Sequence, residues 1–228
     1  MSKFDEEISD LKQKLHTMGS LAQASVHRAI KAMRNRDDGL AMTAKEEDKD
    51  IDELELEIDE AAIGLLPRAR TPEELRLIIV VTKIARDLER VGDEATSISR
   101  RAFDLNQDAQ SQPTVDIPHR ADIAVRMLNE GMEAFWNADP GRARAIIPRD
   151  KEVDAWNRQL HRELTNEIMK TPDAAPRCLS LMAVSKCLER IADHATNIAE
   201  SVVYLYEGRD IRHTGRGKVR PADPNQLA

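Results

Sequence analysis

One sequence motif occurs twice in this chain, one hundred residues apart. Residues 86–100 read RDLERVGDEATSISR, and residues 186–200 read KCLERIADHATNIAE. The correspondence continues upstream with an offset of 102, where residues 32–52 align with residues 134–154. The change of offset indicates that one turn differs by two residues between the two copies. A fixed internal period is typical of a duplicated supersecondary unit, so the sequence predicts a tandem repeat.

Each repeat is expected to contain three long helices. In the first repeat, apolar residues recur every three or four positions over about residues 4–36, 40–66 and 72–105. This is the spacing of one buried helix face. Thr71 followed by Pro72 predicts the start of the third helix, because Thr caps helices and Pro favours their first turn. Strand signals are nearly absent. The predicted fold class is therefore all-α, with two three-helix bundles side by side and six long helices.

The repeats set the expected domain boundaries. The first three-helix repeat covers residues 1–106 and the second covers residues 119–208. Residues 107–118 are expected to form a linker, because they are polar, contain two prolines and lack helical periodicity. Residues 209–228 are expected to be a disordered tail. A weak contact with an anionic surface is the alternative for the basic residues of this tail, which are Arg209, Arg212, Arg216, Lys218 and Arg220.

Composition restricts the classes of function. The net charge of −7 provides no general basic surface, which argues against binding to nucleic acid. No stretch approaches the roughly 18 apolar residues of a membrane-spanning helix, and the N-terminus lacks the apolar core of a signal peptide. A cytoplasmic protein is therefore expected. Cys178 and Cys187 would lie about 13 Å apart along one helix, too far for a disulfide, so both are expected to be reduced.

Acidic pairs spaced four residues apart are the candidate functional residues. Each motif carries such a pair, and each second helix carries an acidic stripe. If the second and third helices are antiparallel, equal rise per residue puts Glu89 level with Asp52 and Asp93 level with Asp48. The same reasoning applies to the second repeat. The complete candidate set is Asp48, Asp52, Glu89, Asp93, Asp150, Asp154, Glu189 and Asp193.

Two interpretations of these carboxylates remain open. Like charges four residues apart on a helix repel one another, and divalent or trivalent cations are the usual partners of clustered carboxylates, so metal binding is one interpretation. A solvated surface is the other, because Glu89 and Asp93 are expected to point outward. Basic neighbours would then form surface ion pairs, namely Arg86, Arg90, Lys186 and Arg190. His194, next to Asp193, is a candidate additional ligand.

The motifs resemble those of the PhoU family of phosphate-signalling regulators. The resemblance covers nearly the whole chain and rests on Asp48-Lys49-x-x-Asp52 and on residues 88–95 (LERVGDEA), 188–200 (LERIADHATNIAE) and 207–213 (EGRDIRH). It implies a negative regulator of phosphate uptake and phosphate-starvation signalling. Such a regulator acts between the ATPase of the high-affinity phosphate ABC transporter and its sensor histidine kinase. The resemblance also implies multinuclear iron or zinc clusters at the acidic pairs, with manganese or magnesium as alternatives.

The sequence departs from the family pattern at two places. Ala192 stands where the family usually has glycine, which tightens the packing but leaves the carboxylates in place. Residues 70–76 (RTPEELR) form a shorter entry to the third helix than the family's Gln-Pro-x-Ala-x-Asp-Leu-Arg. The partner surface of the first repeat is the feature that this second difference would affect.

Other functions compete with the adaptor role. A related regulator of a low-affinity phosphate permease uses the same kind of helical unit. A carboxylate-bridged di-iron enzyme would need Glu-x-x-His motifs, and no histidine here has a glutamate three positions before it. A structural dimerisation bundle would simply leave the carboxylates in water. The expectation is a homodimeric adaptor without enzymatic activity, in peripheral contact with membrane complexes and without a nucleic-acid partner.

Overall fold

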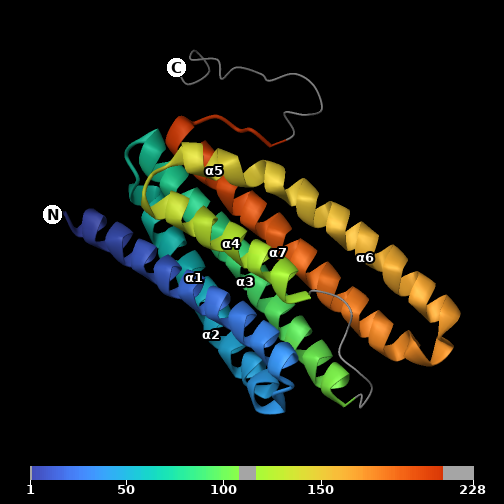
Figure 1. The fold of residues 1–228 in the computed structure, drawn as a ribbon. Helices are drawn as coiled ribbons and strands as arrows, with labels where there is room; N and C mark the ends of the chain where they lie inside the picture. Colours follow the sequence, from blue (N-terminus) through green and yellow to red (C-terminus); the bar gives the residue numbers. More distant parts are fainter. Residues whose placement is uncertain (1, 108–116, 213–228) are drawn as a thin grey trace.

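The computed structural model describes residues 2–107 and 117–212, and these residues form helices without any strand (Figure 1). The predicted all-α fold is confirmed. The first bundle contains α1 (Lys3–Asn35), α2 (Asp38–Leu65) and α3 (Pro72–Asn106). The second bundle contains α4 (Ile117–Trp136), α5 (Pro140–Ile146), α6 (Asp150–Lys170) and α7 (Ala175–Glu207). Most of the predicted linker (108–116) and most of the predicted tail (213–228) lie outside the described residues.

Side-chain caps encoded in the sequence start the helices of the first bundle. The Asp37 carboxylate accepts the backbone N–H of Leu40 at 3.0 Å at the start of α2. Thr71 and Glu74 form a reciprocal capping box at the start of α3, with Pro72 as the first helical residue. The predicted start of the third helix is therefore confirmed. Each cap contributes about 1 kcal/mol to stability by satisfying backbone donors that the helix itself leaves unpaired.

The second helix of the second bundle is interrupted, unlike α2. After α5, the 3₁₀ segment η2 (Ile147–Arg149) leads into α6. Pro148 in this segment lacks an N–H, and its ring disfavours continuation of an α-helix. At the equivalent positions α2 runs without a break. Consequently Asp150 is the first residue of α6, whereas its repeat equivalent Asp48 lies within α2.

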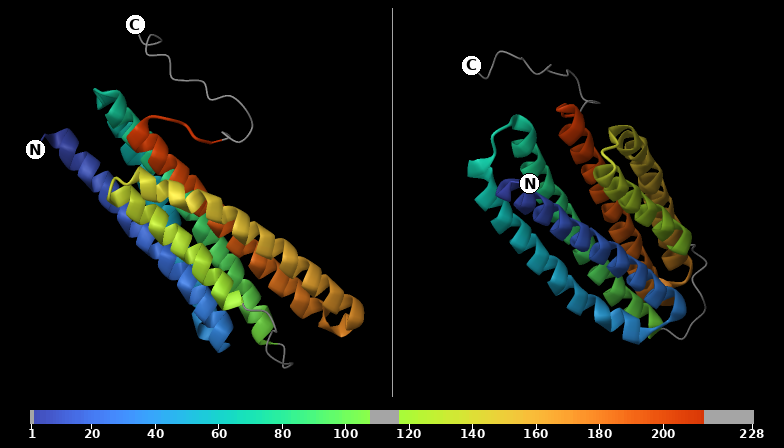
Figure 2. Two further views of the ribbon diagram at one scale, coloured as in Figure 1. Left: turned by 45° about the horizontal axis from the view of Figure 1, so that its top comes forward. Right: turned by 90° about the vertical axis from the view of Figure 1, so that its left-hand side faces the viewer.

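The two bundles pack through α3 and α7, which lie side by side and antiparallel (Figures 1 and 2). Asp87 of α3 contacts His194 of α7, and further along α3 Glu94 contacts Arg190. The Cys187 thiol is also hydrogen-bonded to Glu94. Positions 87 and 94 correspond to positions 187 and 194 in the repeat. The Asp87–His194 contact therefore has an equivalent in the Glu94–Cys187 contact, with the roles of the two bundles exchanged. This is the pattern expected for an approximate twofold axis between the bundles.

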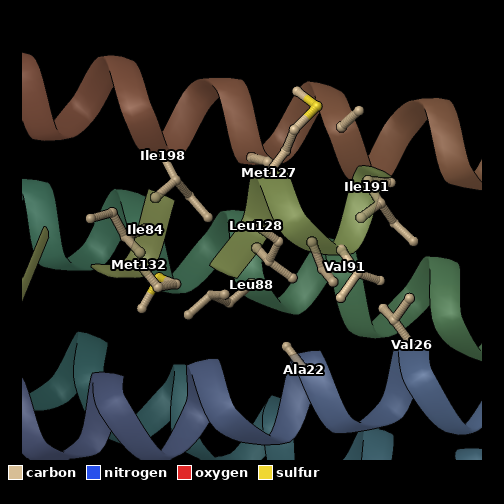
Figure 3. Packing of buried hydrophobic residues seen from close by; sticks show 14 of the residues in the cluster. Ala22, Val26, Ile84, Leu88, Val91, Met127, Leu128, Met132, Ile191 and Ile198 are labelled. Carbon is tan, nitrogen blue, oxygen red and sulfur yellow. The ribbon is translucent and has the colours of Figure 1, made fainter. Parts of the chain in front are cut away.

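One hydrophobic core extends through both bundles (Figure 3). Leu88 of α3, Ile191 of α7 and Met132 of α4 are buried in the same cluster. Burial of one large aliphatic side chain contributes about 1.5–3 kcal/mol. Cys178 and Cys187 are buried and free, as predicted. This shared core fixes α3 and α7 relative to each other, and with them the carboxylates that these helices carry.

Candidate functional site

A group of carboxylates lies between α2 and α3. Its members, here called the first cluster, are Asp48, Asp52, Glu55, Glu89 and Asp93. Burial raises the pKa of Asp48, and the charges of Asp52 and Asp93 raise it further. Burial also raises the pKa of Glu89 to about 7, with contributions from neighbouring carboxylates that include Asp93 and Asp52. Asp93 therefore lies near Asp48, and Glu89 lies near Glu55 and Asp52, which agrees with the matched heights from the turn geometry.

The prediction that both third-helix carboxylates point outward is wrong for the glutamate. The side chain of Glu89 is 15% exposed, whereas that of Asp93 is 46% exposed. Glu189 in the second bundle is similarly covered, at 14% exposure. The sequence argument considered only the apolar seam of α3. A helix packed against that seam also covers its flank, and the longer glutamate side chain lies in the groove that results.

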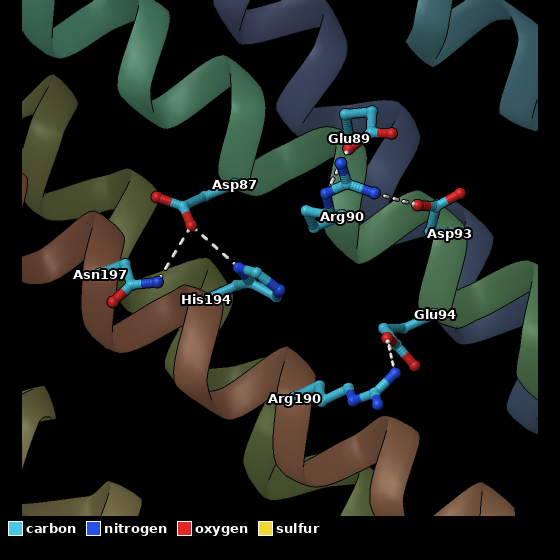
Figure 4. A network of polar contacts seen from close by, with 8 residues as sticks. All are labelled: Asp87, Glu89, Arg90, Asp93, Glu94, Arg190, His194 and Asn197. Carbon is cyan, nitrogen blue, oxygen red and sulfur yellow. Dashed lines mark hydrogen bonds and ion pairs between the residues drawn. The ribbon is translucent and has the colours of Figure 1, made fainter.

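Arg90 neutralises part of the first cluster. Its Nε lies 3.2 Å from Glu89 Oε2, and its Nη1 donates to Asp93 Oδ2 at 2.9 Å (Figure 4). Arg86 acts on Glu55 at longer range and opposes the rise of its pKa, which burial causes. The predicted ion pairs thus form in part. Five carboxylates facing two arginines still leave the first cluster with an excess of negative charge.

A second carboxylate group lies between α6 and α7. Its members, here called the second cluster, are Asp150, Asp154, Glu189 and Asp193. Asp150 and Asp193 lie within hydrogen-bonding reach of each other, and burial is the main cause that raises the pKa of each. Two carboxylates can share a hydrogen bond only when one is protonated. Lys186 pairs with Glu189, and Arg158 Nη1 lies 3.6 Å from Asp154 Oδ2.

The donor chemistry of both clusters fits a metal ion. Carboxylate oxygens are preferred ligands of hard and borderline cations. Glu89 Oε2 and Asp150 Oδ1 are buried and accept no hydrogen bond, although Arg90 Nε lies 3.2 Å from Glu89 Oε2, so each oxygen can still accept a proton or a metal ion. Within residues 2–107 and 117–212, however, no group of three or more His, Cys, Asp or Glu side chains is arranged so that it could hold a metal ion. The clusters supply charge and donors, and ligation itself stays a prediction.

His194 contacts the neighbouring bundle rather than the second cluster. Its Nδ1 lies 2.9 Å from Asp87 Oδ1, and Asn197 Nδ2 donates to the same oxygen at 3.1 Å (Figure 4). A groove of about 730 Å³ runs beside this contact, with Asp93 and Arg190 in its wall. His194 was a candidate additional ligand next to Asp193, with hydrogen bonding alone as the alternative, and its contact with Asp87 turns it towards α3.

Sequence reasoning missed the polar contacts between the bundles. Glu94 is 8% exposed, and its Oε1 accepts a hydrogen bond from Arg190 Nη1 at 2.9 Å. Burial, followed by the hydrogen bond to Glu94, raises the pKa of the Cys187 thiol to about 12. A signal was present in the sequence: Glu94 aligns with His194, and Asp87 aligns with Cys187. At these two positions, unlike residues in the matching motifs form contacts between the bundles, whereas Gly92, which aligns with the unlike Ala192, packs within its own bundle.

Each bundle matches one copy of a known protein domain. None of the described helices has the length and apolar character needed to cross a membrane. The family model for the PhoU domain matches residues 15–102 and 117–202, one match in each bundle. The chain belongs to the PhoU family. The resemblance predicted from the repeated motifs is thereby confirmed.

Named PhoU proteins match most of the chain. The phosphate-specific transport system accessory protein PhoU homolog of Pseudomonas aeruginosa is 37% identical over 220 residues, which is 96% of this chain and 91% of that protein. The phosphate-specific transport system accessory protein PhoU of Escherichia coli is 31% identical over 214 residues, which is 93% of this chain and 89% of that protein.

Two PhoU crystal structures share the fold. That of PhoU from Pseudomonas aeruginosa has a TM-score of 0.87 at 37% identity and covers 90% of this chain and 100% of its own. That of the phosphate transport system regulatory protein PhoU from Streptococcus pneumoniae has a TM-score of 0.84 at 24% identity and covers 92% and 99%. The tandem three-helix architecture is therefore that of PhoU.

The glycine of the PhoU motif has a packing role in the first bundle. A Cβ atom at Gly92 would lie 3.0 Å from Ile51 Cδ1 and 3.1 Å from Asp48 Oδ1. The missing side chain lets α2 approach α3, which brings Asp48 into the first cluster. Ala192 occupies the equivalent position in the second bundle and is fully buried. The second bundle accommodates this methyl group and still brings its four carboxylates together.

Proposed function

We propose that this protein is an accessory regulator of phosphate transport, which restrains phosphate uptake and phosphate-starvation signalling when phosphate is plentiful. The observation that carries the proposal is the match, over more than nine-tenths of this chain, to proteins named phosphate-specific transport system accessory proteins. Both PhoU domains of the family are present. The regulator acts by contact with other proteins rather than by catalysis.

The proposed site of action is the cytoplasmic side of the transporter, where the protein acts as an adaptor between the transporter ATPase and a sensor histidine kinase. The shared core supports this role because it holds the two bundles as one body. The Asp87–His194 and Glu94–Arg190 contacts add polar links across the same interface. Two similar but unequally charged bundles offer separate surfaces, and complementary charge is what selects a partner at such surfaces.

We further propose that the two clusters take up metal ions, either iron or zinc, or alternatively manganese or magnesium. A bound cation would neutralise the excess carboxylate charge in each interhelical groove. In the first cluster, Glu89 and Asp93 on α3 would hold it together with Asp48 and Asp52 on α2. The neighbouring carboxylates that help to raise the pKa of Glu89 support this proposal, because a bound cation would relieve the same repulsion. The ligands in the second cluster would be Asp150, Asp154, Glu189 and Asp193.

Deletion of the gene tests the regulatory proposal. A phosphate-starvation reporter should rise in phosphate-rich medium and should return to its basal level when the wild-type gene is restored. Unchanged reporter output in the deletion strain would sink the proposal. The same deletion in a strain that lacks the high-affinity ABC transporter separates the two candidate transport systems. An effect that persists there would point to a low-affinity permease instead.

Direct binding tests the adaptor role. The purified full-length protein should bind the transporter ATPase and the cytoplasmic part of the kinase in separate titrations, and binding to neither would contradict the role.

The expected homodimer also stays a prediction. Sedimentation equilibrium of the same preparation checks it, because a monomer and a dimer of a 25.7 kDa chain differ twofold in mass.

A further inference from the structure

The acidic charge of this protein is concentrated on one helix. Helix α2 contains eleven Asp and Glu residues and two Lys residues, which gives it a net charge of −9, whereas the whole chain carries −7. The remaining 200 residues therefore carry a net charge of +2. The first cluster accounts for only three of the eleven carboxylates, so most of this charge is not explained by the candidate metal site.

Two large apolar side chains stand among these charges on the outer face of α2. Leu56 is 69% exposed and Ile63 is 70% exposed. Their separation of seven residues places them on one line along the helix. Glu53 and Glu60 lie on one side of this line, and Asp59 lies on the other. We call these five residues the α2 ridge.

The carboxylates of the α2 ridge have no partner among the residues that the structure describes. Glu57, on the same helix, forms an ion pair with Lys14 of α1. No such pair is present for Glu53, Asp59 or Glu60 within that part of the chain. Like charges at these spacings repel each other, and exposed leucine and isoleucine gain nothing from water. The ridge thus combines unpaired carboxylates with exposed large apolar side chains, and a helix face that only contacts water needs neither.

The equivalent face of α6 has neither feature. With the repeat offset of 102, Leu56 corresponds to Arg158, Glu60 to Arg162 and Ile63 to Thr165. The other two positions hold Ala155 and His161. Both helices belong to the same structural unit and have the same buried face, so the fold itself does not require the ridge. Its pattern belongs to the surface of the first bundle alone.

We propose that the α2 ridge docks a basic amphipathic helix of a partner protein. Apolar side chains one heptad apart on that helix cover Leu56 and Ile63, as in helix pairs that pack along a heptad seam. Lys and Arg residues on both sides of its apolar line pair with Glu53, Glu60 and Asp59. The inference deepens the proposed regulatory function, on which it rests, by naming the surface and the chemistry of the partner segment.

A designed peptide tests the chemistry of the ridge directly. The probe is a fluorescent three-heptad helix with Leu at heptad spacing and Lys or Arg on both flanks. It is titrated with the full-length protein and with the Leu56→Ser/Ile63→Ser variant, which keeps every charge. Affinity should fall about tenfold in the variant, because truncation of central apolar contacts carries much of the energy of such interfaces. Unchanged affinity would overturn the proposal, since binding would then depend on charge alone.

A matched variant in the second bundle is the control. Met169 is 77% exposed and Leu179 is 59% exposed, so Met169→Ser/Leu179→Ser removes a similar exposed apolar area elsewhere. This variant should bind the peptide like the wild type. An equal loss of affinity in both variants would contradict a specific site.

Sedimentation of both variants tests the alternative that the ridge binds a second copy of this chain. If Leu56→Ser/Ile63→Ser converts a wild-type dimer into monomers, the ridge is a dimer interface and the proposal is wrong.

The reporter assay separates failure of this inference from failure of the proposed function. Replacement of the chromosomal gene by the Leu56→Ser/Ile63→Ser variant should raise reporter output in phosphate-rich medium, as deletion does. If deletion has no effect, the regulatory function fails whatever the peptide shows. If deletion raises output while the variant represses fully and binds the peptide normally, only the ridge inference fails.

Discussion

The two bundles use the same motif to build carboxylate clusters, yet the third-helix carboxyl whose pKa is raised to about 7 differs between them. In the first bundle burial raises the pKa of the glutamate, Glu89, to about 7. In the second bundle it is the aspartate, Asp193, whose pKa is raised, through burial and its contact with Asp150. Duplication has kept the backbone positions of the acidic pairs. Neighbouring side chains decide which oxygen is buried, and so which carboxylate resists ionisation.

The outer faces of the bundles differ more than their cores. Helix α2 carries a net charge of −9, whereas α6, with five acidic and four basic residues, carries −1. The buried positions Leu88 and Leu188 are identical and equally covered. Packing therefore constrains both copies alike, whereas the surface of each copy is free to suit a different partner. The difference between α2 and α6 is where distinct functions of the two repeats are expected.

Truncation of the equivalent core leucines should have the largest effect. Leu88→Ala and Leu188→Ala each remove a side chain that is at most 2% exposed within the shared core. Each should lower the free energy of unfolding by about 2–5 kcal/mol, measured by urea denaturation. Leu179→Ala, at an exposed position, serves as a control and should change stability by less than about 0.5 kcal/mol. A large loss from only one core variant would show that the bundles do not share a core.

Replacement of the equivalent arginines should have a smaller and unequal effect. Arg190→Gln leaves Glu94, whose side chain is 11% exposed, without its cation. The expected cost is about 1–3 kcal/mol, because a buried acceptor loses its charged donor. Arg90→Gln should cost at most about 1 kcal/mol, since Arg90 and Asp93 are both half exposed. Equal losses in denaturation experiments would contradict the difference that the structure indicates.

The pH dependence of stability should reflect the raised pKa values of Glu89 and Asp193. Between pH 4.5 and about 7 the unfolded Glu89 carboxyl ionises while the folded one retains its proton. The contribution of Glu89 to the free energy of unfolding should therefore be fully present below that interval and be lost as the pH rises through it. Glu89→Gln should remove about 1 kcal/mol of this loss, a value reduced for partial exposure. Asp193→Asn should likewise remove the loss that arises from the second cluster. If the pH profiles of both variants run parallel to that of the wild type, the raised pKa values of Glu89 and Asp193 are contradicted.

Much of the fold was predictable because it depends on local and periodic signals. The spacing of apolar residues predicted the helices, Thr71 predicted a helix start, and the turn geometry placed Glu89 level with Asp52, whose charge contributes to the raised pKa of Glu89. The break at Pro148 was missed because the uninterrupted first repeat served as the template. The burial of Glu89 was missed because it depends on a second helix, which the periodicity of a single helix does not reveal.

Contacts between the bundles were the least predictable part of the site. The Asp87–His194 contact joins residues more than one hundred positions apart, and neither helix alone indicates which face meets the other. The resemblance to PhoU added candidate metal ligands but not the exposure of their side chains. What the sequence could have shown is the mismatch of Asp87 with Cys187, which marks a position where the two copies differ in their surroundings.

The central claim is that both duplicated clusters are built to hold a cation. Elemental analysis of the full-length protein, purified without chelators, tests it most directly. Two variants are measured in parallel: Glu89→Gln/Asp93→Asn and Glu189→Gln/Asp193→Asn, which keep side-chain size and remove charge. The account predicts stoichiometric iron, zinc, manganese or magnesium in the wild type, with each variant losing the share of its own cluster. A wild-type protein without metal, or equal metal content in all three proteins, would contradict it.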